Sequence, residues 1–513
     1  MLVAVELIAF TALFVACRAA NYREVFFGGE IYFADADCYA RMTRARICFQ
    51  HPGTVIRHHK FENFPVGTTP HTTAPFDYAI VGLATVLRLF TARALELSGA
   101  LVSPLLGLLG GWFLWWWLRA MRFRFRAVAL FLFAASPILV HATALGRPDH
   151  QSLELVLVLL ALCAEWTLHG ERSARWEITS ASAWGLALWV SLYEPLGILA
   201  IVLLFRALPK RRGALGFAPA KWWLVFGSFM LVAFAIEQRA LWFFPSVENA
   251  RLAANWLSSI GEMRPLFSNP HLWFEWTGYF LPLAAMLLGF GFLRRRLPPI
   301  FIVAVLAITF VAMLWQARWG YFATVTLCLL LPALLSSSER YSFLIWVAVV
   351  LATFPILRAW DESLWPNESI ATQRAERARE QVDLRAASTA LSGVEAESFL
   401  APWWLSPAVA YWSGKDGVAG SSHEAIDGIL DSARFFAGAD PVAAREILLR
   451  RRVGWVIAYD AERTLANSRA ILGVPATSPA LATILDRTPS QAPDFRPVYA
   501  NGTAKVFRVG ISH

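Results

Sequence analysis

Three short acidic motifs lie far apart in the chain, and each carries residues that could do chemistry beside a membrane. Their ionisable members are Asp35 and Asp37, Asp149 with His150, and Glu262. A carboxylate beside a bilayer is costly to desolvate, so it needs a cation, a hydrogen-bonding partner or a catalytic role. If the fold brings these motifs to one face of a membrane, they can converge on a single metal-dependent site.

The first two motifs have the composition of a site for a hard divalent metal ion. Carboxylate oxygens from Asp37 and Asp149 are ligands that magnesium and manganese prefer, and a histidine ligand would favour manganese. The second motif also holds several polar side chains within a very short turn, residues 144–154, between two apolar runs. Capping needs fewer polar side chains than this turn contains.

Helix capping is nevertheless the simpler interpretation of both acids. Asp35 or Asp37 could cap a helix that starts at Cys38, because short acidic side chains accept hydrogen bonds from the first backbone N–H groups. Asp149 follows Pro148, and a proline is typical of the first turn of a helix. On its own, each motif is therefore compatible with a structural role.

Two further charged residues sit where external loops are expected. Arg318 lies at the predicted outer end of an apolar run, and a guanidinium is well suited to phosphate recognition. The alternative is an interfacial anchor whose charged end extends towards the headgroups. Glu262 is either a solvated loop acid or a carboxylate that faces a substrate.

The composition predicts a membrane protein that crosses the bilayer several times and carries a soluble portion. Among 513 residues, 57% are hydrophobic and 16% are charged, and the mean hydropathy is +0.48. Soluble domains are typically about a quarter charged. The formal net charge of +9 does not indicate nucleic-acid binding, because the basic residues cluster in short loops between apolar runs.

The apolar runs and the charges between them predict a topology. Runs long enough to span a bilayer fall near 2–20, 98–118, 126–143, 152–169, 178–192, 195–208, 222–241, 275–293, 299–315, 320–336 and 341–359. The basic loops are 119–126, 169–175, 209–221 and 294–296. These loops should be cytoplasmic by the positive-inside rule. The loops left outside are 21–97, 144–151, 193–194, 242–274 and 316–319.

This topology places all three acidic motifs outside a plasma (inner) membrane, with the N-terminus in the cytoplasm. The first apolar run has no basic segment before it and no small-residue cleavage site, so we expect a retained helix rather than a signal peptide. Within the first loop, residues 76–93 are predicted to form an external amphipathic helix. Cys38 and Cys48 lie in the same loop, where a disulfide is one possibility.

The tail differs in composition from the rest of the chain. Residues 360–513 contain a charged helical stretch at 372–391 and a strand-like run at 453–459. Helices that alternate with short β-rich runs indicate a compact α/β domain. We therefore predict a transmembrane domain, 1–359, with a large first external loop, and a soluble extracytoplasmic α/β domain, 360–513.

Several motifs together resemble the catalytic subunit of oligosaccharyltransferase, in its archaeal and bacterial single-subunit forms, within the C-type glycosyltransferase (GT-C) superfamily. The resemblance covers most of the chain. Segment 35–41 (DADCYAR) resembles the first-loop motif of the family, and 63–68 (NFPVGT) resembles its "YPxG" continuation. Segment 146–154 is similar to the archaeal "GxxDHHxxE" motif, and 259–262 (SIGE) to "TIxE".

The resemblance implies a fold, an activity and a set of roles. The fold would be a GT-C bundle of about 11–13 transmembrane helices. Asp37 would bind the metal and contact the acceptor, Asp149 would bind the metal, and Glu262 would hold the acceptor amide. Arg318 falls where the family binds the phosphates of its lipid-linked donor. The metal would be Mn²⁺ or Mg²⁺, and Asp37 and Glu262 would be the catalytic acids.

Two departures from the family pattern bear on these roles. The second metal ligand after Asp149 is normally histidine or glutamate, and Gln151 occupies that position here, with His150 beside it. The family's sequon-reading "WWDYG" motif corresponds to WWLSP at 403–407. Trp403 and Trp404 would therefore either contact the acceptor or only pack the soluble domain.

The sequence thus predicts a metal-dependent glycosyltransferase that moves a glycan from a polyprenyl-(di)phosphate donor to an acceptor outside the membrane. An asparagine amide of a protein is the acceptor that the resemblance implies. A hydroxyl of protein, lipid or glycan is the close alternative. A transporter or flippase fits less well, because its ionisable residues would lie near the bilayer midplane. A catalytically inactive scaffold is a further alternative, since Gln151 carries no charge.

Overall fold

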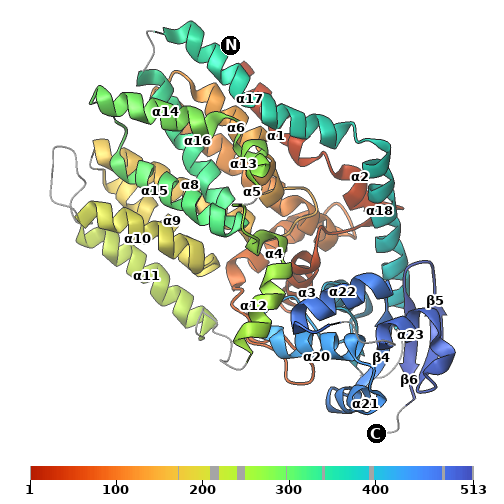
Figure 1. Cartoon of the computed structure of the whole chain (residues 1–513). Helices are drawn as coiled ribbons and strands as arrows, with labels where there is room; N and C mark the ends of the chain where they lie inside the picture. Colours follow the sequence, from red (N-terminus) through yellow and green to blue (C-terminus); the bar gives the residue numbers. More distant parts are fainter. Residues whose placement is uncertain are drawn as a thin grey trace. The chain divides into compact units, whose positions relative to one another are not determined.

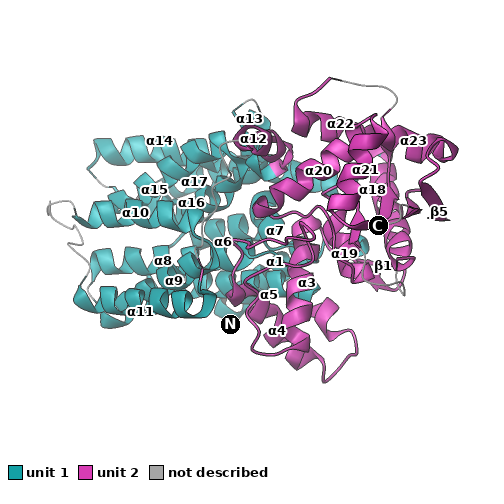
Figure 2. Ribbon diagram, turned by 90° about the horizontal axis from the view of Figure 1, so that it is seen from below, with its two compact units in different colours: residues 1–25, 99–238, 262–367 teal, residues 26–98, 239–261, 368–513 magenta. Residues whose placement is uncertain are grey.

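The computed structural model describes residues 2–171, 173–207, 219–239, 249–267, 269–295, 297–337, 341–391, 398–475 and 480–510. The basic residues at 210–212 and 296, used above for the topology, lie outside the described residues. The chain forms two compact units (Figure 2). Unit 1 comprises 1–25, 99–238 and 262–367, and unit 2 comprises 26–98, 239–261 and 368–513. The predicted division at residues 359 and 360 stays a prediction.

Unit 1 is helical in its described residues, and its helices run side by side (Figures 1 and 2). The helices are α1 Leu2–Arg18, α2 Tyr22–Val25, α5 Ala94–Ala120 (from Gly99 on), α6 Arg126–Ala135, α7 Pro137–Ala142, α8 Gln151–Gly170, α9 Ala174–Val190, α10 Tyr193–Ala207, α11 Ala220–Glu237, α13 Pro270–Thr277, α14 Phe280–Leu293, α15 Ile300–Trp315, α16 Gly320–Ser337 and α17 Ser342–Leu364. The 3₁₀ turns η1 Gly261–Met263 and η2 Ala317–Trp319 precede α13 and α16.

Apolar length in this unit is sufficient for membrane crossing. Five described helices are long and apolar enough to span a bilayer, namely α5, α8, α11, α17 and α16 with η2. The pair α13 and α14 would add a sixth, although the two helices meet at 81°. Shorter apolar helices include α6 and α15. The predicted total of about 11–13 transmembrane helices stays a prediction.

Helices α8 and α16 form the centre of unit 1. Of their apolar windows, 72% and 83% are buried, against 17% for α11 and 28% for α17. A helix that is apolar on all sides is enclosed by other helices or faces lipid. The burial therefore separates a central pair, α8 and α16, from two helices with mostly uncovered apolar faces. The candidate site residues lie at the start of each central helix.

The apolar run predicted as one span at 126–143 is broken between α6 and α7. Pro137 begins α7, and a proline cannot donate the backbone hydrogen bond that would continue the helix. Arg18, which is 2% exposed, donates to the carbonyls of Ala134, Phe133 (3.1 Å) and Leu139 (3.3 Å). These hydrogen bonds satisfy carbonyls around the break, because a guanidinium has five N–H donors.

Unit 2 combines helices with a small sheet. Its helices are α3 Ala36–Gln50, α4 Ala74–Leu87, α12 Ala250–Ser259, α18 Glu368–Thr389, α19 Ser406–Ser413, α20 Ile426–Ala437, α21 Pro441–Arg450, α22 Ala461–Leu472 and α23 Leu481–Arg487, with 3₁₀ turns η4 His423–Ala425 and η5 Pro489–Gln491. A hairpin, β1 Phe26–Phe27 and β2 Glu30–Ile31, lies in the first loop. A helix is confirmed over most of the predicted range 76–93, as α4, but it is apolar, and the predicted amphipathic and external character stays a prediction.

The sheet of unit 2 lies in the C-terminal segment and has strand order β3-β4-β6-β5. Its strands are β3 Ser398–Leu400, β4 Val453–Ala458, β5 Phe495–Ala500 and β6 Lys505–Val509. β3 pairs with β4 in parallel, and the other pairs are antiparallel. All six residues of β4 are buried, which fits its unbroken apolar sequence. The predicted α/β character of the tail and the strand near 453–459 are confirmed.

Candidate functional site

The backbone of the turn that precedes α8 is fixed to α5 by two hydrogen bonds. Gly146 donates its N–H to the carbonyl of Ala100 (3.0 Å), and Ser103 donates its hydroxyl to the carbonyl of Arg147 (2.5 Å). Gly146 has a φ of 71°, in the left-handed region that glycine adopts without a steric cost. The turn therefore presents its side chains from a well-anchored backbone.

Asp149 is buried directly before the N-terminus of α8. The hydroxyl of Ser152 donates to the carbonyl of Asp149 at 2.8 Å. Nδ1 of His150 lies 2.7 Å from one carboxylate oxygen of Asp149, and Nη2 of Arg147 lies 3.6 Å from the other. The positive end of the helix dipole also favours a carboxylate at this position. The N-cap position of α8 belongs to His150 and not to Asp149, whose carboxylate has His150 and Arg147 as charged neighbours.

Glu262 accepts hydrogen bonds from three side chains of unit 1. Its Oε1 accepts from Nη2 of Arg147 (2.8 Å) and from the hydroxyl of Tyr321 (3.0 Å). Its Oε2 accepts from Nε2 of Gln151 (2.6 Å). The Glu262 side chain is 24% exposed, so it is not the solvated loop acid of the alternative interpretation. It links the 3₁₀ turn η1 to α8 and α16.

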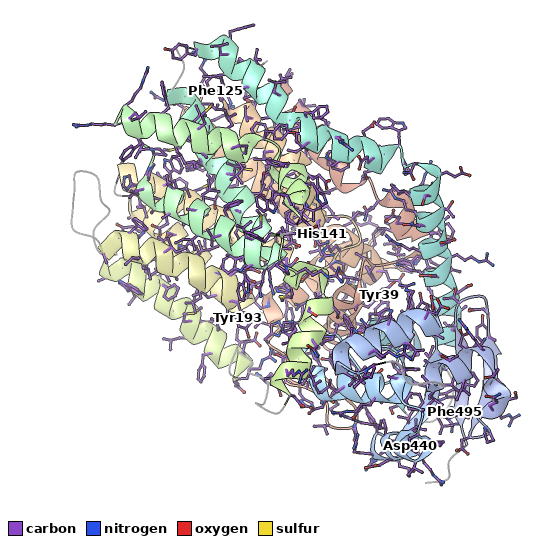
Figure 3. All side chains as sticks on the ribbon, viewed as in Figure 1. Tyr39, Phe125, His141, Tyr193, Asp440 and Phe495 are labelled. Carbon is purple, nitrogen blue, oxygen red and sulfur yellow. The ribbon has the colours of Figure 1, made fainter. Side chains whose placement is uncertain are left out.

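Tyr321 extends this hydrogen-bonded chain to α7. Because its hydroxyl donates to Glu262, the same hydroxyl accepts from Nδ1 of His141, 2.8 Å away. The rings of His141 and Tyr321 stack at 6.1 Å with an interplanar angle of 10°. His141 is labelled in Figure 3, among the side chains of the helical bundle. The hydrogen-bonded chain His141–Tyr321–Glu262 is therefore held by three separate segments: α7, α16 and η1.

Arg318 forms a buried ion pair. Its Nε lies 2.5 Å from Oε1 of Glu194, at the start of α10, and the two side chains are 14% and 4% exposed. An interfacial anchor would extend its charge into water, which this burial does not allow. Glu154, one turn into α8, is 1% exposed and interacts electrostatically with Glu194 and Arg318.

The oxygen donors around Asp149 fit a hard cation in chemical type. Oε1 of Gln151 and Oε1 of Glu154 are buried and accept no hydrogen bond from the described residues. Such orphaned oxygens suit magnesium or manganese. However, no three His, Cys, Asp or Glu side chains within the described ranges are arranged to hold a metal ion. The metal site and its ligand set Asp37, Asp149, Gln151 and His150 therefore stay a prediction.

Asp37 lies in unit 2, in the first turn of α3. The capping role belongs to its neighbour Asp35, whose Oδ1 accepts from the backbone N–H of Cys38 at 3.0 Å. Asp37 is exposed. The two acids of the motif therefore have different surroundings: Asp35 is the N-cap of α3, and Asp37 is exposed in its first turn. Cys38 and Cys48, considered above as a disulfide, are both free thiols.

A buried ion cluster holds α3 against α4 within unit 2. Asp77 of α4 accepts from Arg41 (2.9 Å) and Arg44 (2.5 Å) of α3, and all three side chains are at most 5% exposed. Arg44 also lies 2.7 Å from Nε2 of His59. A guanidinium can only donate, so Nε2 accepts and the proton of neutral His59 lies on Nδ1. The first turn of α3, with Asp37, is thereby fixed at the end of a rigid helix.

The proton on Nδ1 of His59 points to Glu62, 2.5 Å away. Thr68 (2.8 Å) and Ser422 (2.5 Å) donate their hydroxyls to the same oxygen. Burial alone would raise the pKa of Glu62, but His59 and the hydroxyl donors stabilise its charged form and lower the pKa to about 2. Burial lowers the pKa of His59. Glu62 joins the first loop to the C-terminal segment within unit 2.

Trp403 and Trp404 contact each other and the core of unit 2. The indole N–H of Trp403 donates to Oδ1 of Asn467 (2.9 Å), and its ring meets the edge of Trp256 at 5.5 Å. Trp404 meets Trp403 edge-on at 6.1 Å. These contacts support the packing interpretation for Trp403. A role of either tryptophan in acceptor binding stays a prediction.

Several residues of the unit 1 cluster received no role in the sequence analysis. Glu194 interrupts two apolar runs, and His141 and Tyr321 lie close to the ends of others. Polar residues at the end of a predicted span are the signal that could have identified them. Their mutual proximity depends on the packing of α7, α10 and α16, which single-sequence patterns do not encode.

Comparisons with solved structures show the fold. The archaeal oligosaccharyltransferase AglB from Archaeoglobus fulgidus, in complex with an inhibitory peptide and a dolichol-phosphate, matches with a TM-score of 0.66 and 14% identity, over 92% of this chain and 71% of that one. An Archaeoglobus fulgidus oligosaccharyltransferase complex with Zn and sulfate matches with a TM-score of 0.61 and 16% identity, over 88% and 68% of the two chains.

ArnT from Cupriavidus metallidurans, bound to undecaprenyl phosphate, has a TM-score of 0.55 and 14% identity, over 98% of this chain and 97% of that one. No family model matches the chain. No curated protein matches it in sequence. The predicted α-helical polytopic fold of GT-C type, with a C-terminal α/β portion, is confirmed.

Proposed function

We propose that the protein is a membrane glycosyltransferase that moves a glycan from a polyprenyl-linked phosphate donor to an acceptor on the extracytoplasmic face. The observation that carries the proposal is the buried charged cluster at the ends of α8, α10 and α16. Burying Asp149, Glu194 and Arg318 at the edge of an apolar bundle is costly. A cost of this kind is expected where a functional site requires it.

Each residue of the cluster has a role in this proposal. Arg318 binds the donor phosphate and stabilises the negative charge that develops when the bond from the sugar C1 to the phosphate oxygen breaks. The electron pair of that bond remains on the phosphate. The acceptor nucleophile forms the new bond at C1, and its proton passes to the carboxylate of Asp37. Glu262 orients the acceptor.

A divalent metal, Mn²⁺ or Mg²⁺, belongs to the proposal as a cofactor. Asp149 and the Oε1 atom of Gln151 would hold it, with Asp37 and His150 as the remaining predicted ligands. When bound, such an ion would neutralise charge on the leaving phosphate. The solved complex of the archaeal oligosaccharyltransferase with Zn and sulfate supports a divalent cation in this fold.

An asparagine amide is the first candidate acceptor, by resemblance to oligosaccharyltransferases. A hydroxyl acceptor is the second candidate, and the surroundings of Glu262 favour it. Arg147 and Tyr321 both donate to Oε1 of Glu262, and the carboxamide of Gln151 already donates to Oε2. Three donors leave one lone pair on Oε2, so Glu262 can accept one further N–H or O–H without displacing the Gln151 carboxamide. A hydroxyl acceptor has only one such donor, whereas an asparagine amide has a second N–H that must be placed elsewhere.

The test compares cells that carry the wild-type protein, Asp149→Asn, or no protein. Mass spectrometry of their glycoproteins and glycolipids should show one glycan transfer product that requires the wild-type protein and is lost with Asp149→Asn at equal expression. Asn keeps the shape of the side chain and removes its charge. Transfer that persists unchanged with Asp149→Asn would contradict the catalytic proposal and leave the scaffold or transporter alternatives.

The same spectra distinguish the two acceptors. Asparagine-linked glycopeptides as the only product that depends on the protein would support the amide acceptor. A product confined to lipids, glycans or hydroxyl-bearing side chains would exclude the amide and support the second candidate. A control variant is Asp486→Asn, which makes the same chemical change at a part-exposed ion pair of unit 2.

A further inference from the structure

The end of α4 and the turn that follows it expose apolar side chains on one face. Val86 is 56% exposed, Leu89 76% and Phe90 80%. The backbone N–H of Leu89 donates to the carbonyl of Val86 (3.3 Å), so the chain keeps a helical path beyond the last residue of α4. Side chains three and four residues apart lie on the same face of such a path. Exposed neighbouring apolar side chains of this size indicate a surface that binds lipid or protein.

The opposite face of α4 is fixed in the interior of unit 2. Ile80 and Ala84 are fully buried. Asp77 is held by the guanidiniums of two arginines of α3. A rotation of α4 that buried its exposed apolar side chains would break these ion pairs, and breaking a buried ion pair is strongly destabilising. The exposed apolar face is therefore a fixed feature of unit 2.

The exposed face lies close in the chain to a helix that can cross a membrane. Ala94, four residues after Phe90, begins α5, which is one of the apolar helices long enough to span a bilayer. With 27 residues, α5 is about 40 Å long, more than the hydrocarbon thickness of about 30 Å, so its ends reach the headgroups. Four residues of extended chain cover at most about 14 Å. Phe90 is therefore within reach of the membrane surface on the side where α5 begins.

We infer that Leu89 and Phe90 insert into the lipid leaflet on the side where α5 begins, with the guanidinium of Arg88 among the phosphate headgroups. Arg88 is exposed directly before this apolar pair. Apolar side chains of an interfacial segment enter the leaflet while neighbouring cations stay at the anionic headgroups. The continuity with α5 favours lipid over a protein partner. Because ion pairs join α4 to α3, the insertion holds the helix that carries Asp37 beside the same leaflet.

The test uses spin labels on the full-length protein in nanodiscs of phosphatidylethanolamine and phosphatidylglycerol. A nitroxide is attached at Phe90→Cys, or at Leu89→Cys in a second variant, and the five native cysteines are buried. Oxygen concentrates in the acyl layer, whereas a polar nickel chelate stays in water. The chelate should collide with the label at position 90 at least about tenfold less often than with a label on a solvated surface. Oxygen should collide with the label at position 90 more often.

The control is Val442→Cys in the first turn of α21. Val442 is 75% exposed, and Arg445 and Glu446, one turn further on, are also exposed, so this face is polar. Chelate collisions at positions 89 and 90 that equal those at 442 would show a solvated turn and overturn the inference. Labels that rarely meet either reagent would show a protein contact, such as a second copy of the chain, and would also overturn it. Neither outcome bears on glycan transfer, so the proposed function is tested separately.

Discussion

At the scale of single residues, Tyr321 is the test of whether Glu262 must be held in one orientation. Its hydroxyl donates to Glu262 (3.0 Å) and accepts from His141 (2.8 Å), so Tyr321→Phe removes two hydrogen bonds with little change of volume. A hydrogen bond to a charged group contributes about 1.5 to 3 kcal/mol. We therefore expect kcat/KM for glycan transfer to fall at least about tenfold.

The control for this variant is Tyr193→Phe, because Tyr193 is 41% exposed at the start of α10. That substitution should change kcat/KM by less than about twofold. Steady-state rates with the purified protein provide the measurement. If Tyr321→Phe and Tyr193→Phe have the same rate as the wild-type protein, Glu262 does not depend on Tyr321, and its role in orienting the acceptor loses its structural basis.

Glu62 gives the second residue-scale prediction, a stability that depends on pH. The pKa of Glu62 is lowered to about 2 in the folded protein, from an ordinary value of 4.5. A depressed carboxyl pKa stabilises the fold above the unfolded value and loses this contribution as pH falls towards the folded value. Between pH 4.5 and about 2, the wild-type protein should therefore lose about 3 kcal/mol from this group.

Thermal unfolding of the solubilised protein, followed from pH 6 to pH 2, measures this loss. Other carboxylates titrate in the same range, so the quantity to compare is the difference between wild type and Glu62→Gln. A glutamine at position 62 can still accept from His59, Thr68 and Ser422 through its carbonyl oxygen. The stability advantage of the wild-type protein should disappear at low pH. A constant difference across the range would show that Glu62 has an ordinary pKa.

The role of a single residue could be predicted from the sequence only where its neighbours in the sequence determine that role. A helix cap by Asp35 or Asp37 follows from two short acidic residues directly before an expected helix, and the structure assigns the cap of α3 to Asp35. The partners of Glu262 did not follow, because Tyr321 lies 59 positions away and Gln151 lies 111 away. Nothing in the spacing of one chain brings these residues together. Packing of α8 against α16 does so.

At the scale of elements, the buried ion pairs between α3 and α4 are predicted to stabilise the fold much more than an exposed ion pair does. Asp77 is fully buried and accepts from Arg41 and Arg44. Asp77→Asn leaves both guanidiniums buried without an anion, which should destabilise unit 2 by about 3 to 5 kcal/mol. Asp486→Asn, at a pair with Lys505 that is 32% exposed on each side, should cost less than about 1 kcal/mol.

Thermal unfolding of the full-length protein at neutral pH compares the two variants directly. Both variants replace an aspartate by asparagine in unit 2, so a difference between their unfolding midpoints reflects the burial of the ion pair and not the type of substitution. Equal shifts in the unfolding midpoint would mean that the Asp77 cluster is accessible to water. Such a result would also remove the argument that α3 holds Asp37 rigidly.

Helix boundaries show which properties of a helix can be predicted from the sequence and which cannot. Apolar length predicted the bundle correctly, and Pro137 marks the interruption of the run at 126–143. Arg18, which donates hydrogen bonds to the carbonyls around this interruption, lies 116 positions from Ala134 in the sequence. Likewise, the run at 275–293 does not reveal the 81° bend between α13 and α14, which occurs at Gly278 with a φ of 60°.

At the scale of the whole molecule, composition and loop charge determined what could be predicted. A low charged fraction and long apolar runs lead directly to a polytopic protein. The grouping of residues 26–98 with 239–261 and 368–513 in one unit was not accessible, because it depends on contacts such as that of Glu62 with Ser422, 360 positions apart. The membrane orientation itself is a sequence prediction that can be tested independently of activity.

Cysteine labelling in intact cells tests this orientation. All five native cysteines are buried free thiols, so a membrane-impermeant maleimide should give little background. Val498, which is 51% exposed in β5, belongs to the tail predicted to be extracytoplasmic. Glu171 is exposed at the C-terminal end of α8, in a loop predicted to be cytoplasmic. Val498→Cys should therefore be labelled in spheroplasts, and Glu171→Cys only after the membrane is permeabilised.

The two positions control for each other, because both side chains are exposed and both react once the membrane is open. The reverse pattern would place the acidic motifs in the cytoplasm, where the proposed acceptor would have to be sought instead. Labelling of both positions in spheroplasts would contradict a topology in which basic loops and tail lie on opposite sides. The predicted and the reverse pattern both put the tail and the turn before α8 on one face, since α8 has to cross the membrane between that turn and Glu171, but only the predicted pattern makes that face extracytoplasmic.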